Sequence, residues 1–190
     1  MIKAIVFDLA GVIYTMGFSF HKEFEVIRGY WNKAKVGEIS NDDFLKLGSE
    51  KFNSSVENFV NFFWDNNELI PGMQELIIKL GEKYKIGFLA NLVEEVYKVD
   101  IDLWDFESFG ESVMSFREKV KKPDVEAIEL IINKLGVEKE EIIYVDDKPE
   151  TIEKYSEYGV KCVKFDSKKQ LIEDLKKLGV ELWQIKFNKG

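Results

Sequence analysis

Short apolar runs recur along the chain and alternate with stretches whose apolar residues are spaced three or four positions apart. The runs are too short for helices and are typical of buried strands in a parallel sheet. They span residues 4–7, 86–90, 113–116, 142–145 and 160–165, and residues 180–187 suggest a further edge strand. Because strands that alternate with helices form parallel sheets with right-handed crossovers, the sequence predicts an α/β protein.

The helices between these runs are predicted from their apolar spacing and from the residues at their ends. Pro123 and Pro149 each stand just inside a helix start, and Gly136 stands where a helix should end. Residues 167–170 have the spacing of a capping box. The predicted helices cover residues 71–83, 93–104, 123–135, 149–158 and 167–178.

Residues 15–69 carry helix signals and no strand signal. Phe20, Phe24, Ile27 and Trp31 have the spacing of a helix that ends near residue 35. Two serine-led capping sequences, at residues 40–43 and 54–57, predict helices through about residues 52 and 67. The sequence therefore predicts two parts: an α/β core from residues 1–14 and 70–190, and a helical insert at residues 15–69.

Composition and charge narrow the classes of partner. The chain of 190 residues is 45% hydrophobic and carries a net charge of -8, which argues against general binding to nucleic acid or acidic membranes. No apolar run is long enough to span a membrane, and the N-terminus lacks a signal-peptide pattern. Cys162 is the single cysteine, so no internal disulfide can form. We therefore expect a cytoplasmic protein, as a monomer or homodimer. If its partner is a small anionic metabolite, a local positive group must oppose the overall negative charge.

Acidic residues follow the predicted strands. Asp8 ends the first run, and Asp146 and Asp147 end the fourth. Carboxylates that converge at strand ends are costly unless a cation neutralises them, and their hard oxygen atoms suit Mg²⁺. With His21 as the only histidine, no histidine–cysteine cluster for zinc exists. The alternative for Asp146 and Asp147 is a helix N-cap before Pro149.

Four short stretches resemble motifs of the haloacid dehalogenase (HAD) superfamily. They are FDLAGVIY at residues 7–14, FLANLVEE at 88–95, KKPDVEAI at 121–128 and YVDDKPETI at 144–152. The resemblance implies a Rossmann-like three-layer core with a parallel sheet and a small helical cap of the C1 type after the first strand. It also implies a phosphatase that uses Mg²⁺ and forms an aspartyl-phosphate.

The resemblance implies a role for each matching residue. Asp8 would be the nucleophile and, with Asp146, Asp147 and the backbone carbonyl of Ala10, would hold the metal. Lys122 would balance the charge of Asp8 and of the phosphate, although composition alone favours a solvated lysine there. The amide of Asn91 would bind the phosphate, and its alternative role is that of a helix N-cap.

Two positions depart from the family pattern. Ala10 stands where the family has the aspartate that acts as general acid and base, and Ala90 stands where it has a hydroxyl residue. The first of three alternatives is a slow or selective phosphatase that acts on a small phosphorylated metabolite. The second is a phosphonatase-like C–P hydrolase that uses a cap lysine as a Schiff base. The candidate lysines are Lys22, Lys33, Lys35 and Lys46. The third is a non-catalytic binding protein that retains the fold.

Overall fold

A computed structural model of the chain describes residues 1–17 and 21–182, and its centre is a five-stranded parallel sheet. The strands lie in the order β3-β2-β1-β4-β5. Their bounds are Ala4–Phe7 for β1, Lys85–Ala90 for β2, Glu111–Met114 for β3, Ile142–Asp146 for β4 and Lys161–Lys164 for β5. In the register, Phe7 lies between Phe88 and Val145, so the carboxyl ends of the three central strands meet at one edge. The predicted α/β fold is confirmed.

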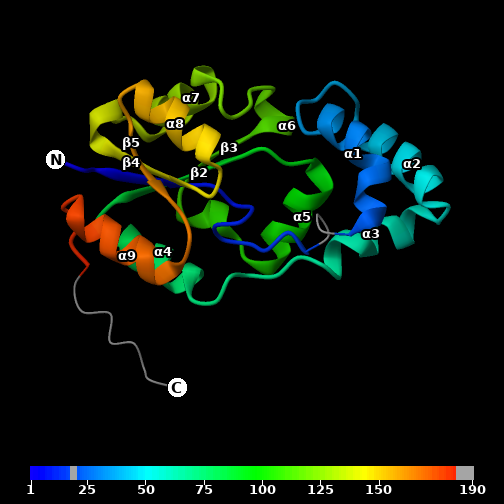
Figure 1. Cartoon of the computed structure of the whole chain (residues 1–190), viewed down its shortest axis with the longest axis horizontal. Coiled ribbons are helices and arrows are strands. Elements are labelled where there is room, and N and C mark those ends of the chain that lie inside the picture. The colour runs from blue at the N-terminus through cyan, green and yellow to red at the C-terminus, as the bar shows by residue number, and fades with distance from the viewer. Residues whose placement is uncertain (18–20, 183–190) are drawn as a thin grey trace.

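Helices cover both faces of this sheet (Figure 1). One face packs against α4 (Met73–Gly81), α5 (Glu94–Leu103) and α9 (Lys168–Lys177). The other packs against α7 (Val125–Leu135) and α8 (Pro149–Glu157). Side chains alternate along β1 accordingly, with Ile5 and Phe7 on the first face and Ala4 and Val6 on the second. All four are fully buried, which explains the continuous apolar run in the sequence.

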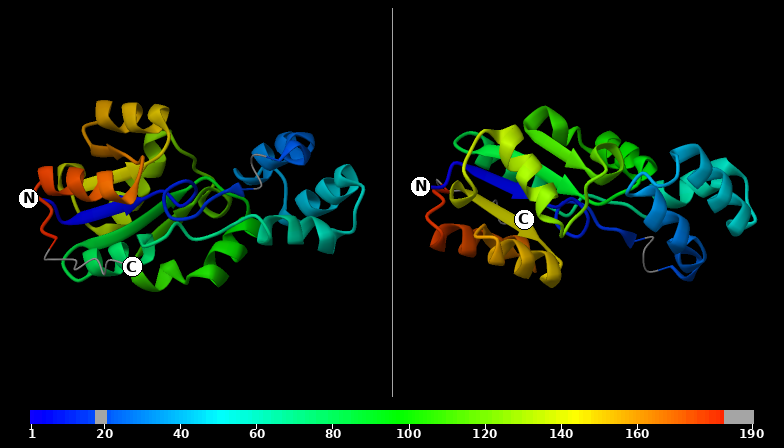
Figure 2. Two further views of the ribbon diagram at one scale, coloured as in Figure 1. Left: turned by 60° about the horizontal axis from the view of Figure 1, so that its bottom comes forward. Right: turned by 90° about the horizontal axis from the view of Figure 1, so that it is seen from above.

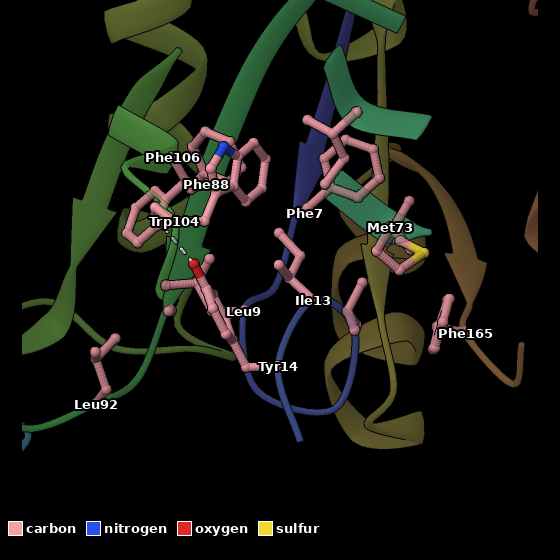
Figure 3. Close-up of a cluster of buried hydrophobic side chains, with 14 of the residues drawn as sticks. Phe7, Leu9, Ile13, Tyr14, Met73, Phe88, Leu92, Trp104, Phe106 and Phe165 are labelled. Carbon is pink, nitrogen blue, oxygen red and sulfur yellow. Dashed lines mark hydrogen bonds between the residues drawn. The ribbon is translucent and has the colours of Figure 1, made fainter. Parts of the chain in front are cut away.

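The loop after β1 is packed firmly into the first of these two apolar layers. Leu9, Ile13 and Tyr14 are buried there, beside Phe88 and Trp104 (Figure 3). The Tyr14 hydroxyl donates a hydrogen bond to the carbonyl oxygen of Trp104 at 3.2 Å. This packing holds the backbone on either side of the loop, and therefore the position of Asp8 at its start.

Three predictions of local structure need correction. The third strand ends at Met114, because residues 115 and 116 already belong to the short helix α6 (Ser115–Glu118). Pro123 lies before α7 rather than inside it, and the N-cap of α7 is Asp124. Residues 180–182 do not form the predicted edge strand, and the rest of that prediction lies outside the described residues. Two 3₁₀ helices complete the core, η2 (Phe106–Phe109) and η3 (Lys139–Glu141).

Between β1 and α4 the described residues form three helices, α1 (Lys22–Ala34), α2 (Asn41–Phe52) and α3 (Val56–Trp64), which we call the helical segment. It stands beyond the carboxyl edge of the sheet (Figure 2). The side chains of Ser40 and Ser55 accept hydrogen bonds from backbone N–H groups and cap α2 and α3. Within the described residues the helical segment contains no strand, and none of the helices described anywhere in the chain has the length and apolar character of a membrane span.

Aromatic side chains form the interior of the helical segment. Trp31, Phe44, Phe59 and Phe63 are buried and their rings contact one another. Gly48 in α2 lets α3 approach, because a Cβ atom there would lie 2.3 Å from the Phe59 ring. The segment therefore has packing of its own and can present a stable surface to the edge of the sheet.

The two connections between core and helical segment run side by side. Tyr14 and Leu69 form an antiparallel bridge, and the Ile70 N–H donates to the Ile13 carbonyl at 2.7 Å. Next to them, the Asn67 side-chain amide donates to a carboxyl oxygen of Asp100 at 2.5 Å. Asp100 is 2% exposed, and this burial raises the pKa of its carboxyl well above the usual value.

Candidate functional site

Asp8 stands at the carboxyl end of β1, where open α/β sheets bind ligands. Its backbone N–H donates a hydrogen bond to the carbonyl oxygen of Val145 in the neighbouring strand β4, at 2.9 Å, so the sheet fixes the backbone of Asp8. Oδ1 of its side chain accepts hydrogen bonds from the backbone N–H of Leu9 at 2.8 Å and from the ammonium of Lys122 at 2.7 Å. Within the described residues Oδ2 accepts no hydrogen bond, so this oxygen is available to a ligand.

Lys122 joins two aspartates that are far apart in the sequence. Its ammonium lies 2.7 Å from Asp8 Oδ1 and 2.7 Å from Asp146 Oδ2. Asp146 is fully buried, and its oxygens also accept hydrogen bonds from the Tyr144 hydroxyl at 2.5 Å and the Lys148 backbone N–H at 2.8 Å. All three groups are therefore held in place before any ligand arrives.

The buried charges shift the pKa of the groups that carry them. Burial raises the pKa of Asp8 to about 7, with Lys122 opposing the shift and Asp146 and Asp147 adding to it. Burial acts to lower the pKa of Lys122, but the two neighbouring carboxylates outweigh it and the pKa is raised. Lys122 is therefore cationic at neutral pH. Because the pKa of Asp8 lies near neutral, a bound ligand can change the protonation of this carboxyl.

Asp147 completes a cluster of three carboxylates. One oxygen from each of Asp8, Asp146 and Asp147 lies within 4.8 Å of the others. Oδ2 of Asp147 pairs with the Lys148 ammonium at 2.8 Å, whereas Oδ1 is buried and has no hydrogen-bond partner. A buried carboxylate oxygen without a donor is costly, and a divalent cation satisfies it. The residues present therefore fit a magnesium site.

Gly11 permits this close arrangement of the β1 loop and Asp147. Its φ of +81° lies in the region that favours glycine, and a Cβ atom there would stand 2.7 Å from Asp147 Oδ2. The backbone conformation and the close approach of Asp147 therefore explain why glycine stands at this position of the first motif.

Asn91 does not cap a helix, which is the alternative role considered from the sequence. The N-cap residue of α5 is Val93. The Asn91 side chain instead forms two hydrogen bonds with the backbone of Lys122. Its Oδ1 accepts from the Lys122 N–H, and its Nδ2 donates to the Lys122 carbonyl oxygen, each at 2.9 Å. Asn91 therefore positions the lysine that contacts Asp8.

These residues line a cleft of about 660 Å³ between the sheet edge and the helical segment. Asp8, Ala10, Asn91, Lys122 and Asp147 line it from the core. The helical segment and the linker before it contribute Met16, Phe24, Arg28, Trp31 and Lys35.

The structure brings together the predicted residues Asp8, Ala10, Asn91, Lys122 and Asp147 around the cleft, and Asp146 lies directly behind them. The N-cap alternative for Asp146 and Asp147 is wrong, because the N-cap residue of α8 is Lys148 and no side chain caps that helix. Sequence reasoning did not identify the bond of Asn91 to Lys122 or the hydroxyl of Tyr144 on Asp146. The first contact joins positions 31 residues apart, for which a pattern of local residues carries no signal. The second joins positions two apart on β4, whose side chains lie on the same face of the strand.

Comparison with known proteins agrees with this geometry. A family model described as haloacid dehalogenase-like hydrolase matches residues 22–165. The chain belongs to this family. A search of curated proteins finds no match. The family match includes Asn91, Lys122, Asp146 and Asp147 but starts after Asp8, so the place of Asp8 in the site rests on the contacts described above.

Solved structures of HAD-family proteins share the fold. A HAD family enzyme from Bacteroides thetaiotaomicron, in complex with magnesium and inorganic phosphate, has a TM-score of 0.76 at 18% identity, covering 90% of this chain and 99% of that one. A predicted HAD-like family hydrolase from Porphyromonas gingivalis has a TM-score of 0.79 at 20% identity, covering 96% and 100%. L-2-haloacid dehalogenase from Xanthobacter autotrophicus has a TM-score of 0.65 at 14% identity, covering 96% and 85%. The chain is thus a HAD-like hydrolase by family and fold.

Proposed function

We propose that this HAD-like hydrolase is a Mg²⁺-dependent phosphatase that acts on a small phosphorylated metabolite through an aspartyl-phosphate at Asp8. The observation that carries the proposal is the placement of Asp8 in the cleft with one oxygen held by Lys122 and the other free. In this proposal residues 15–69, which include the helical segment, act as the cap over the site.

The chemistry follows from the groups that surround Asp8. In the first step a carboxylate oxygen of Asp8 bonds to phosphorus while the bond to the leaving oxygen breaks, and that oxygen keeps the electron pair. In the second step water attacks phosphorus, the bond to Asp8 breaks, and phosphate and the free carboxylate result. Lys122 stabilises both anionic partners, because its ammonium already lies 2.7 Å from Asp8.

The metal site would be formed by Asp8, Asp147 and the carbonyl oxygen of Ala10. Asp146 contributes negative charge, although the hydrogen bonds described above already engage both of its oxygens. A bound magnesium ion supplies charge neutralisation at the phosphoryl oxygens. Within the described residues the buried Oδ1 of Asp147 accepts no hydrogen bond, so it is the carboxylate oxygen that such a cation would satisfy most directly.

Ala10 decides which leaving groups this site would accept. It lines the cleft, and its methyl group cannot protonate a leaving oxygen. General acid catalysis typically contributes about 10²–10⁴-fold, and an alkyl alcohol depends on it more than a phenol or an acyl group does. The proposal therefore favours aryl and acyl phosphates over alkyl phosphates.

The direct test measures hydrolysis of phenyl phosphate by the purified protein with Mg²⁺ and with EDTA. We expect turnover that requires Mg²⁺ and is lost in Asp8→Asn, which keeps the shape of the side chain. Asp166→Asn, at an exposed aspartate outside the cleft, is the matched control and should keep full activity. If wild-type protein cleaves no aryl, acyl or alkyl phosphate, the chain is a binding protein that retains the fold.

One observation favours a second candidate, a phosphonatase-like C–P hydrolase. Of the four lysines considered from the sequence, Lys35 alone lines the cleft; Lys22, Lys33 and Lys46 are exposed elsewhere. Burial, Lys121 and Arg28 lower the pKa of Lys35, which favours the neutral amine that attacks a carbonyl. Borohydride reduction in the presence of phosphonoacetaldehyde would then leave a covalent adduct on Lys35, detectable by mass spectrometry.

A further inference from the structure

The wall of the cleft opposite Asp8 carries a positive charge that the proposed phosphatase chemistry does not use. Among the described residues four cations line the cleft: Arg28, Lys35, Lys122 and Lys148. Lys122 is paired with Asp8 and Asp146, and Lys148 is paired with Asp147 at 2.8 Å. Both of these cations therefore serve the carboxylate cluster.

The two cations on the helical segment differ from each other. Both lie on or just after α1, but the Arg28 guanidinium is held by the carboxylate of Glu25 through two hydrogen bonds. Within the described chain the Lys35 ammonium has no acidic partner, and the charges that act on it most strongly, those of Lys121 and Arg28, are positive. Glu150, the one further acid lining the cleft, projects from α8 on the core side and forms no ion pair with Lys35.

The backbone of Lys35 is fixed close to the catalytic groups. Its carbonyl oxygen accepts a hydrogen bond from the hydroxyl of Ser115, the first residue of α6. The same hydroxyl accepts from the N–H of Leu92, which follows the Asn91 that holds Lys122. The close approach of α6 to α1 in Figure 1 corresponds to this contact. Lys35 is therefore placed over the site by the core itself.

The cleft that Lys35 lines also has an apolar surface. Phe24 and Trp31 of α1 line the same cleft, and their ring centroids lie 5.2 Å apart. A half-buried ammonium has lost part of its hydration, and an anion that reaches it restores the lost interaction. A ligand with an aromatic or apolar body and a distal anionic group matches this arrangement.

We propose that Lys35 forms a second anion subsite in the cleft and that the substrate is a phosphate ester with an apolar or aromatic body and a second anionic group. The inference rests on the proposed phosphatase function and deepens it by naming the substrate class. Lys35 binds the distal anion, and Phe24 and Trp31 contact the body. Asp8 accepts the phosphoryl group, and Lys122 stabilises its negative charge. The net charge of -8 makes such a local cation necessary, because the protein as a whole repels a dianion.

The test compares phenyl phosphate with 4-carboxyphenyl phosphate in wild type, Lys35→Gln and Lys35→Arg, all with Mg²⁺. We expect Lys35→Gln to raise KM for the carboxylated substrate about ten-fold more than for phenyl phosphate, the effect of losing one charge-assisted hydrogen bond. Lys35→Arg should restore most of that difference. Lys33→Gln removes an exposed lysine two residues earlier and is the matched control.

Calorimetric titration separates this inference from the proposed function. Phenylphosphonate and 4-carboxyphenylphosphonate are bound but not hydrolysed, so they report on the subsite even if no phosphate ester is cleaved. Tighter binding of the carboxylated ligand that depends on Lys35 supports the subsite. Equal binding of the two ligands, equal effects of Lys35→Gln on both, or no binding of the carboxylated ligand by wild type overturns it, as does a Schiff-base adduct on Lys35.

Discussion

Replacing Lys122 by methionine tests whether this lysine balances the buried carboxylates. The side chain is 5% exposed, and its ammonium lies 2.7 Å from both Asp8 and Asp146. Removing one partner of a buried ion pair costs about 3–5 kcal/mol, because the remaining charge stays buried without compensation. The free energy of unfolding of a native protein is about 5–15 kcal/mol, so the variant should still fold. With an m-value of about 2 kcal/mol/M, its urea midpoint should fall by about 2 M.

The pH dependence of this loss makes the test specific. The folded-state pKa of Asp8 lies above its unfolded value, so its contribution to stability is present at low pH and is lost as the pH rises towards and through 7. Without Lys122 that pKa rises further, and the deficit in free energy of unfolding should be larger at pH 8 than at pH 5.5. Lys121→Met changes an exposed neighbour and should alter stability by less than about 0.5 kcal/mol.

The measurement is urea unfolding of metal-free protein, followed by circular dichroism at both pH values. A deficit for Lys122→Met below about 1 kcal/mol, or one that is equal at pH 5.5 and pH 8, would refute the assignment of Lys122 as a buried counter-charge.

Three further predictions address the metal, the missing acid and the buried carboxyl at the linkers. Mg²⁺ binding should release a proton from Asp8. The affinity for Mg²⁺, measured by calorimetry, should therefore increase by up to about ten-fold for each pH unit as the pH rises towards 7. Asp8→Asn should flatten that increase. Ala10→Asp should speed hydrolysis of glycerol phosphate by up to about 10²-fold, and an unchanged kcat in a folded variant would mean that protonation of the leaving group is not limiting. Asp100→Asn should raise Tm more at pH 8 than at pH 5. The pKa of Asp100 is higher in the folded than in the unfolded protein, so ionisation of this carboxyl lowers stability as the pH rises above the unfolded-state pKa. A shift of Tm that is equal at both pH values would contradict this.

The sequence predicted the core well where one physical signal dominated. Residues 4–7 and 142–145 form strands because every position is buried between two helical layers, which leaves an uninterrupted apolar run. The predicted third strand was displaced, because residues 115 and 116 are apolar or small but turn into α6. Such a change of direction depends on tertiary contacts, which local apolar spacing does not encode.

The carboxylates of the site were predictable because each one ends an apolar run. The roles of their neighbours were not. Asn91 precedes a helix in the sequence, which favours an N-cap, but the peptide of Lys122 offers it one donor and one acceptor from a loop 31 residues away. Lys35 looked like any lysine at the end of an amphipathic helix. Only the three-dimensional structure shows that Lys35 lines the cleft, with its carbonyl oxygen held by the Ser115 hydroxyl at the start of α6.

The paired connections at Tyr14 and Leu69 have a consequence for how such proteins diversify. Because the outgoing and returning connections are hydrogen-bonded to each other, the chain leaves the core and rejoins it at neighbouring points of the backbone. A different insert with ends equally close together could be grafted there without altering the sheet or the loops that carry the aspartates. The same carboxylate cluster at the sheet edge could thereby be combined with different recognition surfaces.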